Sequence, residues 1–197
     1  MSKVEELKQH MQPGQVYRRA QLAQWSNAVD RHIKKLLDDG TLVKLKGGLY
    51  HYPKKTTFGA VPAEDEALVR AFLKDDRFLI TSPNIYNALG VGTTQLYNEA
   101  VVYNHKRHGH YKLGNRMFDF RVKLDLPEAL SKEFLLVDLV NNLDRLAEDT
   151  ALVKDRVRSK AYSFDLEVLG RAVRYYGKVS TKKFFADVLP ESTVSYG

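Results

Sequence analysis

Residues 1–55 carry the pattern that most restricts the fold of this chain. The strongest helical repeat lies at residues 28–39, where apolar side chains recur every three or four positions and Gly40 can end the helix. Two shorter helical segments precede it, at residues 2–11 and 18–25. Two β-rich runs follow at once, at residues 41–45 and 49–52, joined by Lys46-Gly47-Gly48, whose glycines suit a tight hairpin. This order predicts a winged helix-turn-helix.

The positive charge of the chain is concentrated in the same segment. The whole sequence has 31 Lys and Arg against 24 Asp and Glu, a net charge of +7. Residues 1–55 hold 11 of the basic residues and 5 of the acidic ones, whereas residues 56–197 hold 20 and 19. A basic segment joined to a nearly neutral one is typical of a polyanion-binding module attached to a partner domain. We therefore expect a DNA-binding domain at residues 1–55 and a second domain at residues 56–197.

The solvent side of the third helical segment predicts how the module would contact DNA. At about 100° per residue, Arg31 and Lys35 fall opposite the apolar stripe, and His32 falls at its flank. In a helix-turn-helix the second helix of the motif enters the major groove, where Arg and Asn contact base edges and Lys neutralises phosphate. Lysines on the hairpin would gain from counterion release along the DNA backbone. The predicted DNA contacts are Arg18, Arg19, Ser26, Asn27, Arg31, His32, Lys34, Lys35, Lys44, Lys46 and Lys54. The same pattern also fits a solvated helix face or a winged helix used for protein contacts.

The rest of the chain predicts a mixed α/β domain. Residues 53–62 have turn residues and little periodicity, and are expected to form a linker or a packing strap. The expected elements are helices at 63–74 and 83–90, strands at 78–81, 100–103, 109–113 and 116–124, and helices from 132 onward that end with 181–189. The predicted fold class is therefore α+β, with an N-terminal winged helix-turn-helix followed by a mixed α/β domain with a small central sheet and C-terminal helices.

The sequence holds no recognisable catalytic motif. The absence of cysteine excludes disulfides, a thiol nucleophile and thiolate zinc ligands. His105, His108 and His110 lie close together, but the neighbouring Lys106 and Arg107 oppose cation binding, so a solvated turn or a basic loop is favoured over a zinc site. Phosphate-binding glycine loops, nucleophile elbows and nucleotidyltransferase motifs are not found. We expect no enzymatic activity, no cofactor and no metal.

The beginning of the chain is acidic where a signal peptide would be apolar, and no window approaches the roughly 18 apolar residues of a membrane span. Together with the lack of cysteine, this predicts a soluble cytoplasmic protein without a membrane partner.

Several short motifs, in a fixed order, resemble those of a known family. Residues 46–59 read KGGLYHYPKKTTFG, residues 80–95 read ITSPNIYNALGVGTTQ, and residues 99–104 read EAVVYN. Near the end of the chain, residues 174–177 read RYYG and residues 182–185 read KKFF. In this order the motifs resemble the AbiE-type antitoxins, the AbiEi-like transcriptional regulators of type IV toxin-antitoxin systems.

The resemblance implies a bacterial or archaeal autorepressor whose N-terminal winged helix binds inverted repeats in its own promoter, with two copies on the DNA. It also implies a C-terminal domain with antitoxin activity, directed against a nucleotidyltransferase-like toxin without a stable complex. By position, Asn27, Arg31, Lys34 and Lys35 would lie on the DNA-contacting helix and residues 44–46 in the wing. No motif marks residues for the antitoxin activity. Three alternatives stay open: a stand-alone winged-helix regulator without a toxin, a protein-interaction module, and a nucleic-acid-processing enzyme.

Overall fold

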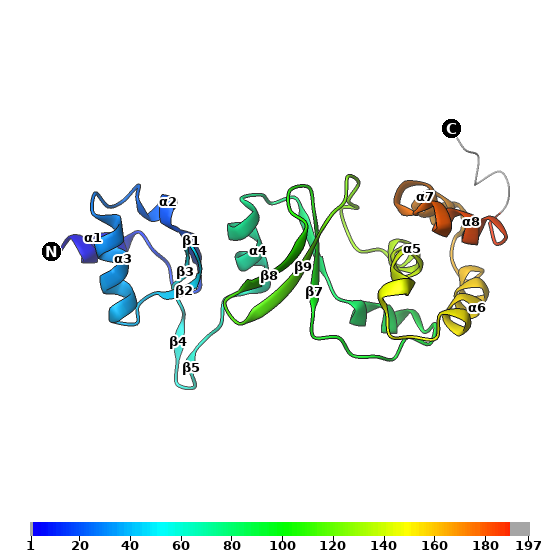
Figure 1. Ribbon diagram of the computed structural model, residues 1–197, viewed down its shortest axis with the longest axis horizontal. Coiled ribbons are helices and arrows are strands. Elements are labelled where there is room, and N and C mark those ends of the chain that lie inside the picture. Colours follow the sequence, from blue (N-terminus) through cyan, green and yellow to red (C-terminus); the bar gives the residue numbers. More distant parts are fainter. Residues whose placement is uncertain (1, 190–197) are drawn as a thin grey trace.

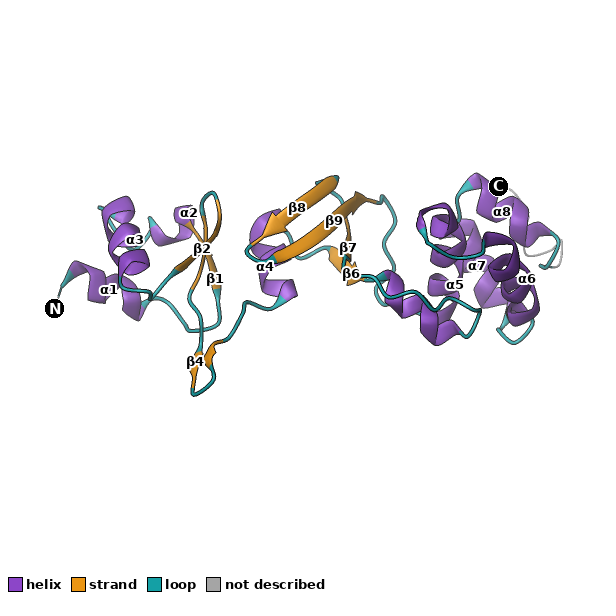
Figure 2. Cartoon of the chain, turned by 60° about the horizontal axis from the view of Figure 1, so that its bottom comes forward, coloured by secondary structure: helices purple, strands orange, loops and turns teal. Residues whose placement is uncertain are grey.

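The computed structural model of the protein describes residues 2–189, and its elements follow one another along one long axis (Figure 1). The N-terminal helices lie at one end, a four-stranded sheet lies in the middle, and helices α5 to α8 lie at the other end (Figures 1 and 2). Among the described residues, no helix combines the length and the apolar character that crossing a membrane requires.

The N-terminal elements pack around a small apolar core. They are α1 (Lys3–Gln9), β1 (Val16–Arg18), α2 (Arg19–Leu22), α3 (Val29–Asp38), β2 (Val43–Lys46) and β3 (Leu49–His51). The strands form an antiparallel sheet in the order β1-β3-β2, and Gly48 turns the β2–β3 hairpin with a φ of 74°. Leu7 of α1 and Leu36 of α3 are buried in the shared core. Ser2 caps α1 by accepting a hydrogen bond from the backbone N–H of Glu5.

Helix α2 is shorter than the predicted segment at residues 18–25. It ends at Leu22, and the chain continues with tighter turns in which Gln24 N–H donates to Gln21 O and Trp25 N–H to Leu22 O. Such i to i+3 bonds are typical of the frayed end of a helix.

Residues 55–60 form a two-stranded ribbon where the sequence predicts a linker or a packing strap. Strands β4 (Lys55–Thr56) and β5 (Gly59–Ala60) pair antiparallel. The hydroxyl of Thr56 donates to Gly59 O at 2.9 Å and accepts from Phe58 N at 3.3 Å, while Gly59 adopts a φ of 112°. These local bonds close the turn, and the ribbon projects from the body of the molecule (Figure 1).

The central sheet is covered by helices on both faces. Its elements are α4 (Asp65–Leu73), β6 (Phe78–Thr81), η1 (Pro83–Leu89), β7 (Ala100–Asn104), β8 (Gly109–Leu113) and β9 (Arg116–Val122). The strand order is β6-β7-β9-β8, in which β7 and β9 are parallel and the other pairs antiparallel. Side chains alternate along β9, so Phe118 and Phe120 pack with α4, whereas Asp119 and Arg121 lie on the opposite face.

Two boundaries in this region differ from prediction. The segment after Pro83 is a 3₁₀ helix, in which Gly90 N–H bonds to Asn87 O. Strand β9 ends at Val122, whose partner Asn104 is the last residue of β7, and Lys123 N–H bonds to Asn104 O at 2.9 Å.

The C-terminal helices confirm the predicted helical region. They are α5 (Lys132–Asn142), η2 (Leu143–Arg145), α6 (Thr150–Ala161), α7 (Leu166–Tyr176) and α8 (Val179–Ala186). Helix α5 is buried on nearly all sides against η1, α7 and α8, which explains its almost continuous apolar sequence. The last helix, predicted at 181–189, lies two residues earlier at its start and ends at Ala186. The chain is therefore α+β, with small sheets and C-terminal helices.

Apolar packing crosses the predicted domain boundary near residue 55. The cluster between α4 and the sheet includes Leu68, Phe72 and Phe120, and Leu49 of β3 is buried in the same cluster. Val16 of β1 packs against it. The N-terminal sheet and α4 thus share one core.

Candidate functional sites

The solvent side of α3 is basic. Arg31, Lys34 and Lys35 are exposed, while Val29 and Ile33 are buried on the opposite side of the helix. Within residues 2–189, none of these three cations forms an ion pair. The predicted Asn27, just before the helix, is exposed as well. This basic α3 face can therefore bind an external anion without first breaking an internal pair.

The one acidic side chain in the first turn of α3 is already neutralised. Arg19 of α2 donates two hydrogen bonds to Asp30, from Nε to Oδ1 at 2.7 Å and from Nη2 to Oδ2 at 2.5 Å. This bidentate bond from Arg19 lowers the pKa of Asp30, so the carboxylate stays ionised and paired. Arg19, a predicted DNA contact, thereby fixes α2 against α3.

His32, a second predicted contact, lies inside the module. Its ring is buried, and Nδ1 lies 2.7 Å from the hydroxyl of Ser26. The same hydroxyl accepts a hydrogen bond from Ala28 N–H at 3.3 Å, just before α3 begins. Ser26 and His32 together hold the turn between α2 and α3.

The tip of the β2–β3 hairpin touches the rest of the chain. Gly114 N–H donates to Leu45 O at 3.1 Å, and the ammonium of Lys46 lies 4.6 Å from the ring centre of Tyr111. The ring centre of Phe72 lies 5.5 Å from the same ammonium. Lys46 is therefore engaged by aromatic faces of the sheet region, whereas Lys44 is exposed without a partner in the described chain.

Arg18 is also engaged inside the molecule. Its guanidinium donates from Nε to Ala71 O and from Nη2 to Phe72 O, the latter at 2.9 Å, near the C-terminal end of α4. Burial lowers the pKa of Arg18, and the nearby charge of Arg107 lowers it further. A cation here donates hydrogen bonds to carbonyls at the end of the helix, and its charge interacts favourably with the helix dipole. Arg18 thus links β1 to α4.

The β4–β5 ribbon stands beside the C-terminal end of α3. Hydrogen bonds from Thr41 lower the pKa of Asp39, and the charges of Lys8 and Lys55 lower it further, so Lys55 lies near the end of α3. Lys54 and Lys55 are exposed at the base of the ribbon. Phe58 at its tip is 100% exposed. Sequence reasoning identified Lys54 but not Phe58, although Thr56 and Gly59 were a signal for a turn.

A buried polar network lies between the sheet and α5. Asp138 of α5 is completely buried, and both Tyr86 and Tyr103 donate hydroxyl hydrogen bonds to its Oδ2 at 2.7 Å. Lys123 donates to Oδ1, also at 2.7 Å. Burial raises the pKa of both tyrosines, and the charge of Asp138 raises it further, so both hydroxyls remain donors. The carboxylate is therefore fully paired.

Arg121 extends this network along β9 to Asp119. Its Nε donates to Asp119 Oδ2 at 2.6 Å and its Nη1 to Asn142 Oδ1 at 3.0 Å. Asn142 in turn donates to the backbone carbonyl of Asp138 at 2.7 Å. Beside the network lies a pocket of about 360 Å³ whose lining includes Arg121, Lys123, Arg145 and Lys178.

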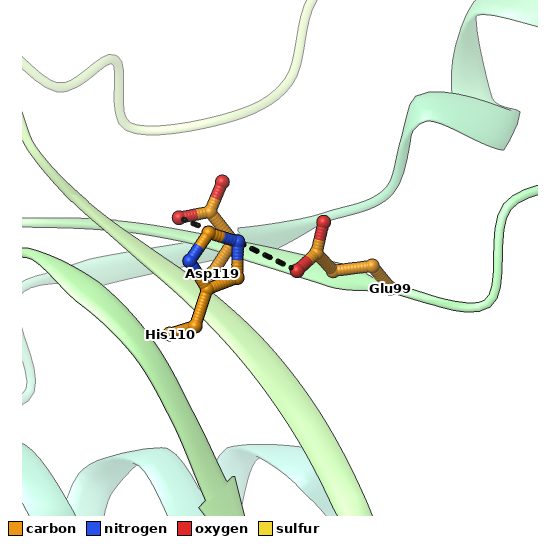
Figure 3. Close-up of side chains that lie close together, drawn as sticks. All are labelled: Glu99, His110 and Asp119. Carbon is orange, nitrogen blue, oxygen red and sulfur yellow. Dashed lines mark ion pairs between the residues drawn. The ribbon is translucent and has the colours of Figure 1, made fainter. Parts of the chain in front are cut away.

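Glu99, His110 and Asp119 come together at the outer part of the same sheet face (Figure 3). His110 Nε2 lies 3.0 Å from Glu99 Oε1 and 3.9 Å from Asp119 Oδ1. The other two histidines of the cluster, His105 and His108, lie in the connection between β7 and β8. Sequence reasoning grouped the three histidines and missed the two acids, Asp119 in β9 and Glu99 just before β7.

No family model and no curated protein matches the sequence. The fold is similar to the crystal structure of the RV2827C protein from Mycobacterium tuberculosis, with a TM-score of 0.57 and 17% sequence identity. The similarity covers 98% of this chain and 75% of that chain. At this identity the similarity concerns the fold alone.

Proposed function

We propose that this protein is a DNA-binding transcriptional regulator that contacts the duplex through the basic α3 face, and that it acts as the autorepressor and antitoxin of a type IV toxin-antitoxin system. The observation that carries the DNA-binding part is the set of exposed cations on α3, Arg31, Lys34 and Lys35, none of which has an acidic partner in the described chain. The antitoxin part rests on the motif resemblance of residues 46–59, 80–95 and 99–104.

The order of the N-terminal elements supports a winged helix-turn-helix. Helices α2 and α3 are joined by a short turn, and the β2–β3 hairpin follows α3 directly. Helix α3 has 10 residues and is therefore about 15 Å long, and an α-helix, about 10–12 Å across with its side chains, fits the major groove of about 12 Å width. In this arrangement Arg31 reaches base edges or phosphates, and Lys34 and Lys35 neutralise phosphates.

The β4–β5 ribbon is the second contact that we propose. The β2–β3 tip is occupied by Tyr111 and the β8–β9 turn, so it is less free to lie on DNA than the projecting ribbon. The ribbon carries Lys54 and Lys55 and ends in the exposed ring of Phe58. Proteins that enter the minor groove combine basic side chains with an apolar wedge that partly unstacks a base step. The ribbon has both features.

The experiment is a salt-titrated gel shift of the purified protein on the DNA upstream of its own gene. We expect specific binding that the double variant Arg31→Ala/Lys35→Ala reduces by at least tenfold, because each such contact contributes about 1–3 kcal/mol. The matched control is Lys160→Ala/Arg171→Ala, which removes two exposed cations from α6 and α7. Binding no tighter than to random DNA, or equal losses in both double variants, would contradict the proposal.

The antitoxin activity needs its own test in cells. We expect expression of the wild-type chain to restore growth when the neighbouring nucleotidyltransferase-like gene is induced, without co-purification of the two proteins. Growth inhibition that persists despite expression of the folded chain would leave a stand-alone DNA-binding regulator as the better description.

A further inference from the structure

We propose that Glu99, His110 and Asp119 form a binding site for a divalent first-row transition-metal ion, independently of any DNA contact. The three side chains offer one imidazole nitrogen and two carboxylates, and their ligand atoms all lie within 4.8 Å of one another (Figure 3).

The sheet register explains why these residues meet. His110 of β8 and Asp119 of β9 are direct partners in the antiparallel ladder. Asp119 is also aligned with Val101 in the parallel β7–β9 pair, and Glu99 lies two residues before Val101. Because side chains alternate between faces, His110 of β8, Asp119 of β9 and Glu99, just before β7, lie on one face of the sheet. A rigid sheet thus brings together ligands that are far apart in the sequence.

The distances from His110 to the two acids are close to those between ligands of one ion. Ligands about 2.0–2.2 Å from a metal lie roughly 3–3.6 Å from each other. The 3.0 Å separation of His110 Nε2 from Glu99 Oε1 already meets this, and the 3.9 Å separation from Asp119 Oδ1 requires a shift of a few tenths of an ångström. The side chain of His110 is 62% exposed and that of Glu99 39%, so both can rotate by this amount.

Asp119 is the fixed ligand. It is 3% exposed, and the guanidinium of Arg121 holds its Oδ2. Among residues 2–189 no hydrogen bond reaches its Oδ1, and the nearest imidazole nitrogen, at 3.9 Å, lies beyond hydrogen-bond distance. Oδ1 is thus free to bind a metal ion held between His110 and Glu99.

Arg121 supports the metal-binding carboxylate of Asp119 through its second oxygen and does not compete with the ion for Oδ1. Metal-bound carboxylates are commonly held by hydrogen bonds to their second oxygen, and Arg121 is itself anchored on Asn142. Two carboxylates and one guanidinium give the surroundings of the His110 ring a net charge of −1, which attracts a divalent cation.

The donor set selects the class of ion. Mg²⁺ and Ca²⁺ prefer oxygen ligands alone, whereas one imidazole with two carboxylates suits Zn²⁺, Mn²⁺ or Fe²⁺. Among these, Zn²⁺ binds a given nitrogen and oxygen site more tightly than Mn²⁺ or Fe²⁺, so Zn²⁺ is the appropriate probe.

The test is isothermal titration of Zn²⁺ into the full-length, EDTA-stripped protein in a non-coordinating buffer. We expect one ion per chain with a dissociation constant in the micromolar range or tighter. His110→Ala and Glu99→Gln should each weaken binding by about tenfold or more, since each removes a ligand. Both side chains are partly exposed, so these variants are expected to fold normally.

The matched control is His105→Ala/His108→Ala, which removes two histidines from the neighbouring connection and leaves the three ligands intact. This variant should bind Zn²⁺ like the wild type. The proposal is overturned if binding does not saturate below about 1 mM. It is also overturned if His110→Ala binds like the wild type, or if the control variant loses binding instead. Co²⁺ substitution gives a second readout, because its visible absorption bands report the coordination geometry, and these bands should change in His110→Ala.

Discussion

The basic α3 face and the buried network around Asp138 are both rich in charge, but they balance it in opposite ways. On α3, Arg31, Lys34 and Lys35 face solvent with no ion pair in the described chain. Between the sheet and α5, the carboxylate of Asp138 is completely buried and receives hydrogen bonds from a lysine and two tyrosines.

The two arrangements have different physical consequences. Exposed like charges add little to folding stability and repel one another, so an external anion explains them better than an internal role does. A buried carboxylate is tolerated only when it is paired, and removing one partner leaves an uncompensated charge. Substitutions on α3 should therefore change DNA affinity alone, and substitutions in the network should change stability.

The largest expected effect comes from the network. We expect Asp138→Ala to lower the free energy of unfolding by about 3–5 kcal/mol, because it leaves Lys123, Tyr86 and Tyr103 without their common acceptor. Urea denaturation followed by circular dichroism measures this. Asp138→Asn keeps an acceptor of the same shape and should lose less. A loss below about 1 kcal/mol for the alanine variant would show that the network does not stabilise the fold.

Arg18 sharpens the comparison. The sequence pattern places it among the predicted DNA contacts, whereas in the structure its side chain hydrogen-bonds to backbone carbonyls of α4. Arg18→Ala should cost about 1.5–3 kcal/mol of stability by freeing the carbonyls of Ala71 and Phe72. It should leave the salt dependence of DNA binding unchanged. The reverse result, unaltered urea stability with a reduced salt slope, would mean that Arg18 leaves α4 to contact phosphate.

The sequence predicts local structure well because local structure depends on local patterns. The apolar repeat of residues 28–39 and the strand patterns of residues 109–113 and 116–124 predict elements that the structure contains as α3, β8 and β9. The ribbon at residues 55–60 was missed because it is too short for a periodic pattern, and a side-chain bond from Thr56 closes it.

Non-local packing limits how much of the candidate sites can be predicted from the sequence. The exposure of Arg31 and Lys35 follows from the helix period alone. The contact of Lys46 with Tyr111 depends on residues 65 positions later in the chain, and no periodicity reports it. Likewise, His110 meets Asp119 and Glu99 only through the strand order, including the parallel β7–β9 pair.

Lysines on α3 and on the β2–β3 hairpin are expected to give smaller effects, which differ in size between the two elements. If Lys34 neutralises one phosphate, Lys34→Ala should reduce the slope of log affinity against log salt by about 0.9. Lys46→Ala should reduce it less, because the ammonium of Lys46 is held between aromatic rings. Fluorescence anisotropy of a labelled duplex over a range of salt concentrations measures both. Equal slopes for the two variants would show that the β2–β3 tip contacts DNA as closely as α3 does.

Phe58→Ala is expected to give the smallest change in folding stability, together with a change in the bend of the bound DNA. Because the ring is 100% exposed, Phe58→Ala should change the free energy of unfolding by no more than about 0.5 kcal/mol. No charge is lost, so the salt slope should stay the same.

If the ring unstacks a base step, the wild type should kink the duplex by roughly 20° or more, and the variant should not. Energy transfer between dyes at the two duplex ends measures the bend, and Phe58→Leu, which keeps an apolar wedge, is the control. An unchanged bend in Phe58→Ala would remove the ribbon tip from the DNA contact and leave the basic α3 face as the part of the surface that binds.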